Sequence, residues 1–328
     1  MSHPLKVLGI VLRGRYFVTL PIPTETKALS ESTIIVTGAN GGLGFESSKR
    51  LSQLGVRKLI MAVRSLNKGE VAKKKILETT GRPESSIDVW SLDMENYASI
   101  EAFANRASQL PRLDGVLANA GIMTFRFESS EGTEKSFNVN VIGTFLLYAL
   151  LLPQMRESGK KTGNACRFSI PNSALHLIAP IQELKASDRT IMDRLSDPKT
   201  SDMAGRYNLT KLLVVYVVRE LAKRNKGSCI VNTPSPSFCK SNLGNDERTA
   251  GFKVFQAVAA RTGEEGSRTL VHGLLAGPET NGQYLNNCKI QTPSPHVTSD
   301  WGEEFQERFF DELLGKLESI RPGISSNI

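Results

Sequence analysis

Residues Ile34 to Phe45 constrain the fold of this chain more than any other stretch. A short β-branched run meets a glycine-rich turn there, and the residues that follow are spaced as in a helix. The order strand, glycine turn, helix builds a phosphate pocket, because glycines let the backbone approach an anion and a helix N-terminus offers unpaired N–H groups. We therefore predict that this stretch binds a phosphate, the alternative being a glycine-rich turn without a ligand.

The glycine spacing separates this loop from two other phosphate loops. A P-loop requires Lys and then Ser or Thr after its last glycine, whereas Gly44 is followed by Phe45-Glu46. The Gly-x-Gly-x-x-Gly fingerprint does not fit either, but Thr-Gly-x-x-x-Gly-x-Gly fits from Thr37 to Gly44. That pattern resembles the cofactor loop of the short-chain dehydrogenase/reductase family. The resemblance implies that the cofactor-binding residues here are Gly38, Asn40, Gly42, Leu43 and Gly44.

The charge of the chain does not require a polyanionic partner. Its 328 residues carry a net charge of +8, but 41 Lys and Arg are offset by 33 Asp and Glu. The longest basic run is Lys73-Lys74-Lys75, on an expected exposed helix face. An enzyme that attracts an anionic cofactor explains this charge as well as a nucleic-acid or membrane partner would, and we expect no nucleic-acid partner.

The cysteines and histidines are scattered, without any Cys-x-x-Cys pair, so neither a disulfide framework nor a metal site is expected. The apolar stretch Leu5 to Leu12 is too short to span a bilayer, and its basic residues follow it rather than precede it. We expect residues 1–30 to be an extension that packs on the domain, with contact to a membrane surface as the less favoured alternative. No apolar run approaches the length of a membrane span, so a soluble, cytoplasmic protein without stable membrane insertion is expected.

Strand-like and helix-like segments alternate without a break, which predicts an α/β fold of the Rossmann type, a doubly wound parallel sheet flanked by helices. Residues 31–328 are expected to form one domain that ends in a helix over 301–320. Residues 174–206 interrupt the alternation and are long for a connection, which indicates a partly ordered lid. A substrate loop is expected over about 238–260.

The residue after the second predicted strand indicates which dinucleotide binds. Arg64 lies twenty residues past Gly44, where dinucleotide folds meet the adenosine ribose. A carboxylate there would bind the 2′-OH of NAD, whereas Arg can pair with the 2′-phosphate of NADP. No carboxylate is present, and Lys68 follows four residues later. NADP(H) is therefore the expected cofactor, and the alternative is a solvated arginine at a strand end.

Tyr207 and Lys211 lie one turn apart on a predicted helix over 207–224. A nearby ammonium favours the phenolate, so this spacing predicts that the pKa of Tyr207 falls toward the working range of an acid or base. Tyr-x-x-x-Lys alone is a weak signal, but its position after the fifth strand is where the short-chain family has its catalytic pair. The resemblance also implies that Lys211 and Tyr207 contact the cofactor.

The same resemblance assigns the remaining site residues. Ser173 matches the catalytic serine that holds the substrate oxygen, and Asn140 matches the asparagine that positions a water in the proton relay, with Asn138 as the competing assignment. The other family landmarks in the cofactor site are Asp93 at the adenine, Asn119 and Gly121 beside the central sheet, and Pro236 near the nicotinamide.

Two departures from the family pattern affect the substrate side. The usual glycine after Pro236 is Ser237, and Pro171 precedes the Asn172-Ser173 pair. Ser173 also lies 34 residues before Tyr207, much farther than in compact members. The whole chain is most similar to the retinol-dehydrogenase-like branch and, within it, to fungal members of secondary-metabolite pathways.

Together these features predict an NADP-dependent oxidoreductase that acts on a lipophilic ketone, aldehyde or secondary alcohol. One alternative is a non-redox cyclase or epimerase on the same fold, and another is a non-catalytic NADP-binding interaction protein. The apolar helices over 134–155 and 207–224 also suggest a homodimer interface, although packing within one chain would explain them equally well.

Overall fold

A computed structural model describes residues 3–25, 27–186, 188–225, 228–240, 243 and 256–328. Among them runs an eight-stranded sheet in the order β10-β9-β8-β7-β4-β1-β2-β3. The strands are β1 Thr33–Thr37, β2 Lys58–Val63, β3 Ile87–Ser91, β4 Gly115–Leu117, β7 Cys166–Ser169, β8 Cys229–Ser235, β9 Tyr284–Asn286 and β10 Lys289–Ile290. Every pairing is parallel except that of β10 on β9. The predicted doubly wound α/β fold is confirmed.

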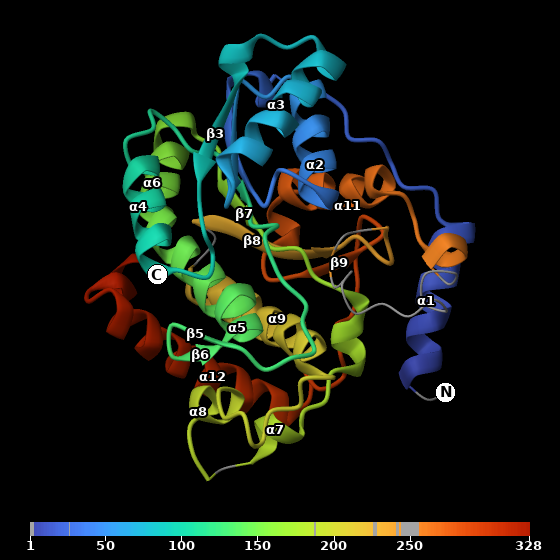
Figure 1. The fold of residues 1–328 in the computed structure, drawn as a ribbon, viewed down its shortest axis with the longest axis vertical. Helices are drawn as coiled ribbons and strands as arrows, with labels where there is room; N and C mark the ends of the chain where they lie inside the picture. Colours follow the sequence, from blue (N-terminus) through green and yellow to red (C-terminus); the bar gives the residue numbers. More distant parts are fainter. Residues whose placement is uncertain (1–2, 26, 187, 226–227, 241–242, 244–255) are drawn as a thin grey trace.

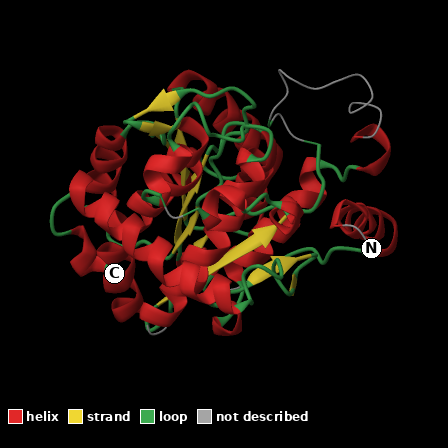
Figure 2. Cartoon of the chain, turned by 90° about the horizontal axis from the view of Figure 1, so that it is seen from below, coloured by secondary structure: helices red, strands yellow, loops and turns green. Residues whose placement is uncertain are grey.

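Helices cover both faces of the sheet, because alternate side chains of its buried strands point to opposite faces. In β1, Ile34 and Val36 join one apolar cluster while Ile35 joins the other. One face carries α2 Gly42–Gln53, α3 Leu66–Thr80 and α11 Gly263–Leu275, and the other α4 Tyr97–Ala107, α6 Thr144–Thr162 and α9 Arg206–Arg224. Figures 1 and 2 show the strands between these helix layers.

The long helix expected over 134–155 is interrupted by one wide turn. It begins as α5 (Lys135–Phe137), continues as a π-helical segment over Asn138–Gly143 and resumes as α6. Such π turns inside helices are often found at functional sites. The continuous helix Lys135–Thr162 has a mean hydropathy of 1.5 in its most apolar window, and 89% of that window is buried within the fold. It is the one described helix with the length and composition of a membrane span, and it packs as a core helix.

The segment 174–206 is more regular than its composition indicates. It contains the 3₁₀ helix η4 (Ala174–Ile178) and the short helices α7 (Gln182–Lys185) and α8 (Ile191–Leu195). Leu184 and Leu195 are fully buried in the main core. The small hairpin of β5 (Ser129–Ser130) and β6 (Thr133–Glu134) lies beside α8. Elsewhere in the described part of the chain, the 3₁₀ helices are η1 Leu29–Glu31, η2 Glu84–Ser86, η6 Pro278–Thr280 and η7 Ile324–Asn327.

Two terminal helices complete the fold. The N-terminal extension forms α1 (His3–Phe17), and Val7 of α1 packs against Ala174 and Leu177 of η4. The C-terminal helix α12 (Asp300–Ile320) packs along α9. The apolar residues of α9 that suggested a dimer interface are thereby buried within a single chain. The homodimer itself stays a prediction. Most of the expected substrate loop, residues 241–242 and 244–255, lies outside the described residues.

Candidate active site

The glycine loop between β1 and α2 adopts a shape that side chains would prevent. Gly38 and Gly42 have φ values of +64° and +53°, which favour glycine. A Cβ on Gly44 would lie 2.5 Å from Asn119 Nδ2 and closer still to the carbonyl oxygen of Gly38. The glycines of the motif are therefore required by the backbone of the loop and by its contact with the end of β4.

The same loop leaves room for an anion at the start of α2. Gly41 precedes the helix in an extended conformation and has no side chain with which to cap it. A Cβ on Gly41 or on Gly42 would meet no described atom within 4 Å. The start of α2 therefore has free space beside its backbone, and the first N–H groups of a helix have no partner within the helix, a combination that fits the pyrophosphate of a dinucleotide.

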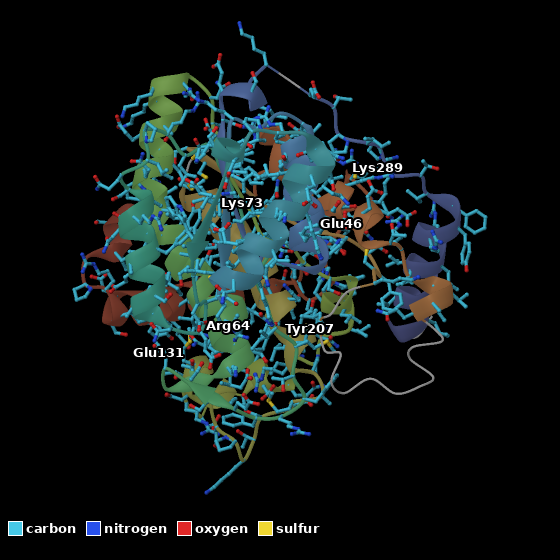
Figure 3. The ribbon with its side chains drawn as sticks, turned by 45° about the horizontal axis from the view of Figure 1, so that its top comes forward. Glu46, Arg64, Lys73, Glu131, Tyr207 and Lys289 are labelled. Carbon is cyan, nitrogen blue, oxygen red and sulfur yellow. The ribbon has the colours of Figure 1, made fainter. Side chains whose placement is uncertain are left out.

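The residues expected at the adenosine end follow the next strands. Arg64 directly follows β2, Lys68 lies in the first turn of α3, and both side chains are exposed. Asp93 follows β3 and is half-buried, and its carboxylate accepts the N–H of Glu95 at 3.0 Å. Figure 3 shows Arg64 and Tyr207 in the half of the molecule that also holds the lid, whereas Lys73 lies nearer the opposite end.

Asn119 and Asn140 tie the end of β4 to its neighbours. The Asn119 side chain donates to the carbonyl of Thr37 at 3.0 Å. The Asn140 amide accepts the N–H of Ile122 and donates to the carbonyl of the same residue, both at 2.9 Å. Gly121 lies close to this contact, since a Cβ there would be 3.1 Å from Asn140 Oδ1.

Asn140, rather than Asn138, faces the helix that carries the tyrosine. Its Nδ2 donates to Thr210 Oγ1 at 3.2 Å, and Thr210 Oγ1 donates to the carbonyl of Tyr207 at 2.8 Å. Asn138 Nδ2 instead donates to the carbonyl of Glu95 and to Ser130 Oγ, away from that helix. The geometry therefore favours Asn140 as the site residue.

Tyr207 and Lys211 lie near the start of α9, and both side chains are buried. The Lys211 ammonium donates to the carbonyl of Pro171 at 2.8 Å and lies 5.6 Å from the centre of the Tyr207 ring. Burial raises the pKa of Tyr207 and lowers the pKa of Lys211 to about 8. The expected fall in the tyrosine pKa is wrong for this structure, because desolvation disfavours the phenolate more than this distant ammonium favours it.

Ser173 is linked to the same lysine through Asn172. Asn172 Oδ1 accepts the N–H of Ser173 at 2.7 Å, and Asn172 Nδ2 donates to the carbonyl of Lys211 at 3.1 Å. The Ser173 hydroxyl is half-buried and caps η4 by accepting the N–H of Leu175 at 3.2 Å. Two sets of hydrogen bonds, Asn140–Thr210–Tyr207 and Ser173–Asn172–Lys211, therefore converge on the first turns of α9.

His176 holds the turn after Ser173, a role that the sequence did not reveal. Its Nε2 accepts the N–H of Ser294 at 3.2 Å, so the ring proton is on Nδ1, which donates to the carbonyl of Ser173 at 2.8 Å. Burial lowers the pKa of His176 to about 4, so the ring is neutral near pH 7. Its partner Ser294 is 118 residues away in the chain, which no local pattern indicates.

Arg206, directly before Tyr207, was also missed. Its fully buried guanidinium lies 3.5 Å from Glu134 Oε2 and 3.1 Å from Glu183 Oε1. Glu134 caps α5 through the N–H groups of Ser136 and Phe137, and Glu183 lies in the lid. One cation thus joins the lid, the helix with Asn140 and the start of α9.

The serine that replaces the family glycine keeps a glycine-like backbone. Ser237 follows Pro236 at the end of β8 with φ +63°, in the left-handed region. Its N–H donates to Ser235 Oγ at 3.2 Å. Replacing the family glycine by Ser237 therefore adds a side chain but keeps the left-handed turn. Holding a residue other than glycine in this conformation costs about 1 kcal/mol.

Comparisons with a family model and with known sequences agree on one protein family. The model of the short chain dehydrogenase family matches residues 32–167. Over 96% of its length the chain is 41% identical to the short chain dehydrogenase/reductase dmxR8 of Cryptosporiopsis sp., covering 99% of that protein. It is 35% identical to the short-chain dehydrogenase/reductase phmF of Phaeosphaeria nodorum, over 93% of this chain and 92% of that one.

Comparison with solved structures agrees on the fold. Salutaridine reductase from Papaver somniferum superposes with a TM-score of 0.60 at 19% identity, over 78% of this chain and 99% of that one. A protein from Mycobacterium paratuberculosis superposes with a TM-score of 0.61 at 21% identity, over 91% of this chain and 96% of that one. At this identity the likeness concerns the fold alone.

Proposed function

Because the chain belongs to the short-chain dehydrogenase/reductase family, we propose that it is an NADP(H)-dependent oxidoreductase of a lipophilic carbonyl compound or the matching alcohol. The observation that carries this proposal is the convergence of two sets of hydrogen bonds on α9, which brings Ser173, Tyr207, Lys211 and Asn140 together next to the strand end that contacts the glycine loop. A protein that only binds a dinucleotide has no need of a buried phenol and ammonium at that place.

The chain's residues have distinct roles in this proposal. NADPH, when bound, supplies the hydride for the carbonyl carbon. The Tyr207 phenol donates its proton to the carbonyl oxygen, and the raised pKa keeps that proton in place until negative charge develops. The Ser173 hydroxyl donates a hydrogen bond to the same oxygen. Lys211 holds positive charge beside the phenol, which favours proton release.

The cofactor residues follow from the geometry of the loop. The N–H groups at the start of α2 would hold the pyrophosphate, and Arg64 with Lys68 would pair with the 2′-phosphate that distinguishes NADP from NAD. Their exposed side chains are free of carboxylate partners among the described residues, and no carboxylate directly follows β2 to favour the ribose of NAD.

The substrate class rests on the apolar residues near Ser173. Leu175 and Ile178 of η4 are half-buried at the edge of the site, which suits an apolar substrate. The similarity to fungal family members supports a place in secondary metabolism. The retinol-dehydrogenase-like branch stays a prediction. A cyclase or epimerase is the second candidate, because the segment that follows Ser173 adds η4, α7 and α8 to the substrate side.

Consumption of NADPH with a lipophilic ketone tests the proposal. The purified protein should oxidise NADPH in proportion to alcohol formed, and Tyr207→Phe should lower kcat by at least about a hundredfold, the usual contribution of a general acid. Tyr216→Phe is the matched control, since this buried tyrosine of α9 donates to the carbonyl of His296. Product formed without net NADPH loss would support the non-redox alternative, and an active Tyr207→Phe would refute the catalytic assignment.

A further inference from the structure

Helix α1 packs against the segment that follows the catalytic serine. Val7 of α1 forms an apolar cluster with Ala174 and Leu177, and Ile10 and Val11 pack at its border. Ala174 is the first residue of η4, directly after Ser173. The N-terminal helix therefore supports the wall of the site on which the substrate oxygen is held.

The same helix touches the turn at the end of β8. Gly14 is buried, and a Cβ built on it would lie 3.3 Å from Ser237 Oγ and 3.5 Å from Asn287 Oδ1. Gly9 of the same helix is exposed, and a Cβ there would meet no described atom within 4 Å. α1 thus approaches the turn after Pro236 so closely that even a methyl group at position 14 would press on Ser237.

One buried arginine fixes this contact. Arg261 is 2% exposed, and its guanidinium donates to the carbonyls of Gly14 and Val18 and, at 2.7 Å, to Asn287 Oδ1. Its main chain pairs with that of Phe238 at 2.8 Å and of Lys240 at 2.9 Å, at the base of the substrate loop. Because burying a guanidinium is costly unless its donors are satisfied, these contacts specify where α1 lies.

These contacts place α1 over the carboxyl ends of two parallel strands. Ser237 follows β8, and Asn287 follows β9, its parallel neighbour. Open α/β sheets bind their ligands at the carboxyl ends of the strands. Figure 1 shows α1 at the edge of the molecule beside the short helical turn over residues 256–259, where the Tyr16 hydroxyl donates to the carbonyl of Val258 at 3.1 Å.

We propose that α1 is the outer wall of the substrate site and determines which carbonyl compounds fit, with Arg261 as its positioning residue. The inference rests on the proposed function and adds to it the element that sets substrate size. Gly14 fixes the closest approach of this wall to the turn beside the nicotinamide site, and η4 carries the wall to Ser173.

Two glycine variants test the wall directly. Gly14→Ala and Gly9→Ala gain the same helix propensity, but only the first adds a methyl group against Ser237. With NADPH and two probes, cyclohexanone and the bicyclic 1-tetralone, Gly14→Ala should change the ratio of kcat/KM between them by at least about fivefold, mainly through KM. Gly9→Ala should leave the ratio unchanged. Equal ratios in both variants and the wild type would overturn the inference.

Hydrogen exchange provides a test that needs no substrate. Arg261→Met should accelerate exchange in residues 174–178 by at least about tenfold while the sheet stays protected. Arg13→Met, at an exposed arginine of α1, should not. Uniform acceleration, or acceleration confined to α1, would refute the positioning role. If the wild type consumes no NADPH with either ketone, the proposed function fails, and the exchange result still decides whether α1 supports the site wall.

Discussion

Replacing Gly44 by alanine adds one methyl group at the most confined point of the glycine loop. Its Cβ would lie 2.5 Å from Asn119 Nδ2 and nearer still to the Gly38 carbonyl oxygen, distances that real side chains do not adopt. Backbone shifts forced by such overpacking cost about 1–3 kcal/mol. If the native loop must be restored to bind the cofactor, this cost weakens NADPH binding by between about fivefold and 150-fold.

The matched control is Gly315→Ala, at an exposed position of α12 far from the loop. Gly315 has no positive φ, and its Cβ would meet no described atom within 4 Å. Calorimetric titration with NADPH should give a raised Kd for Gly44→Ala and a nearly unchanged one for Gly315→Ala. Thermal unfolding of each free protein separates weakened binding from loss of fold. Equal Kd values for Gly44→Ala and the wild type would refute the reasoning that the close approach shapes the cofactor seat.

Three further variants test separate contacts. Arg64→Ala should weaken NADPH binding by about tenfold and leave NADH binding unchanged, whereas the control Lys73→Ala should change neither. Equal losses of affinity for both cofactors would contradict the contact of Arg64 with the 2′-phosphate. The folded protein keeps His176 neutral down to about pH 4, whereas the unfolded chain protonates it near pH 6.5. The free energy of unfolding, measured with urea, should therefore fall by roughly 3 kcal/mol from pH 6.5 to pH 4, and by less in His176→Gln. Arg206→Met leaves the buried carboxylates of Glu134 and Glu183 without their cation and should lower the free energy of unfolding by about 3–5 kcal/mol in the same assay. An unchanged urea midpoint would show that these ion pairs do not stabilise the fold.

The fold and the shape of the glycine loop could be predicted because their signals are local. Glycine spacing from Thr37 to Gly44 indicates positive φ values and a close backbone contact, and the structure has both. The apolar runs of the parallel strands report burial on both faces. Arg64 after β2 was placed by counting along one strand and one helix.

The substrate side was less predictable because its contacts join distant parts of the chain. Arg206 meets Glu134 across 72 positions, and His176 meets Ser294 across 118. The pKa of Tyr207 was predicted to fall from its spacing to Lys211, but spacing does not report burial, which dominates here. The composition of 174–206 suggested partial order, whereas Leu184, Ile191 and Leu195 of this segment are buried in the main core.

Transfer of label from NADPH tests the central claim most directly. The protein would be incubated with 1-tetralone and NADPH deuterated at both C4 positions, and the alcohol analysed by mass spectrometry. The account predicts one deuterium on the former carbonyl carbon, with formation of this alcohol nearly lost in Tyr207→Phe and retained in Tyr216→Phe. A product without deuterium, or one formed equally well by Tyr207→Phe, would contradict it.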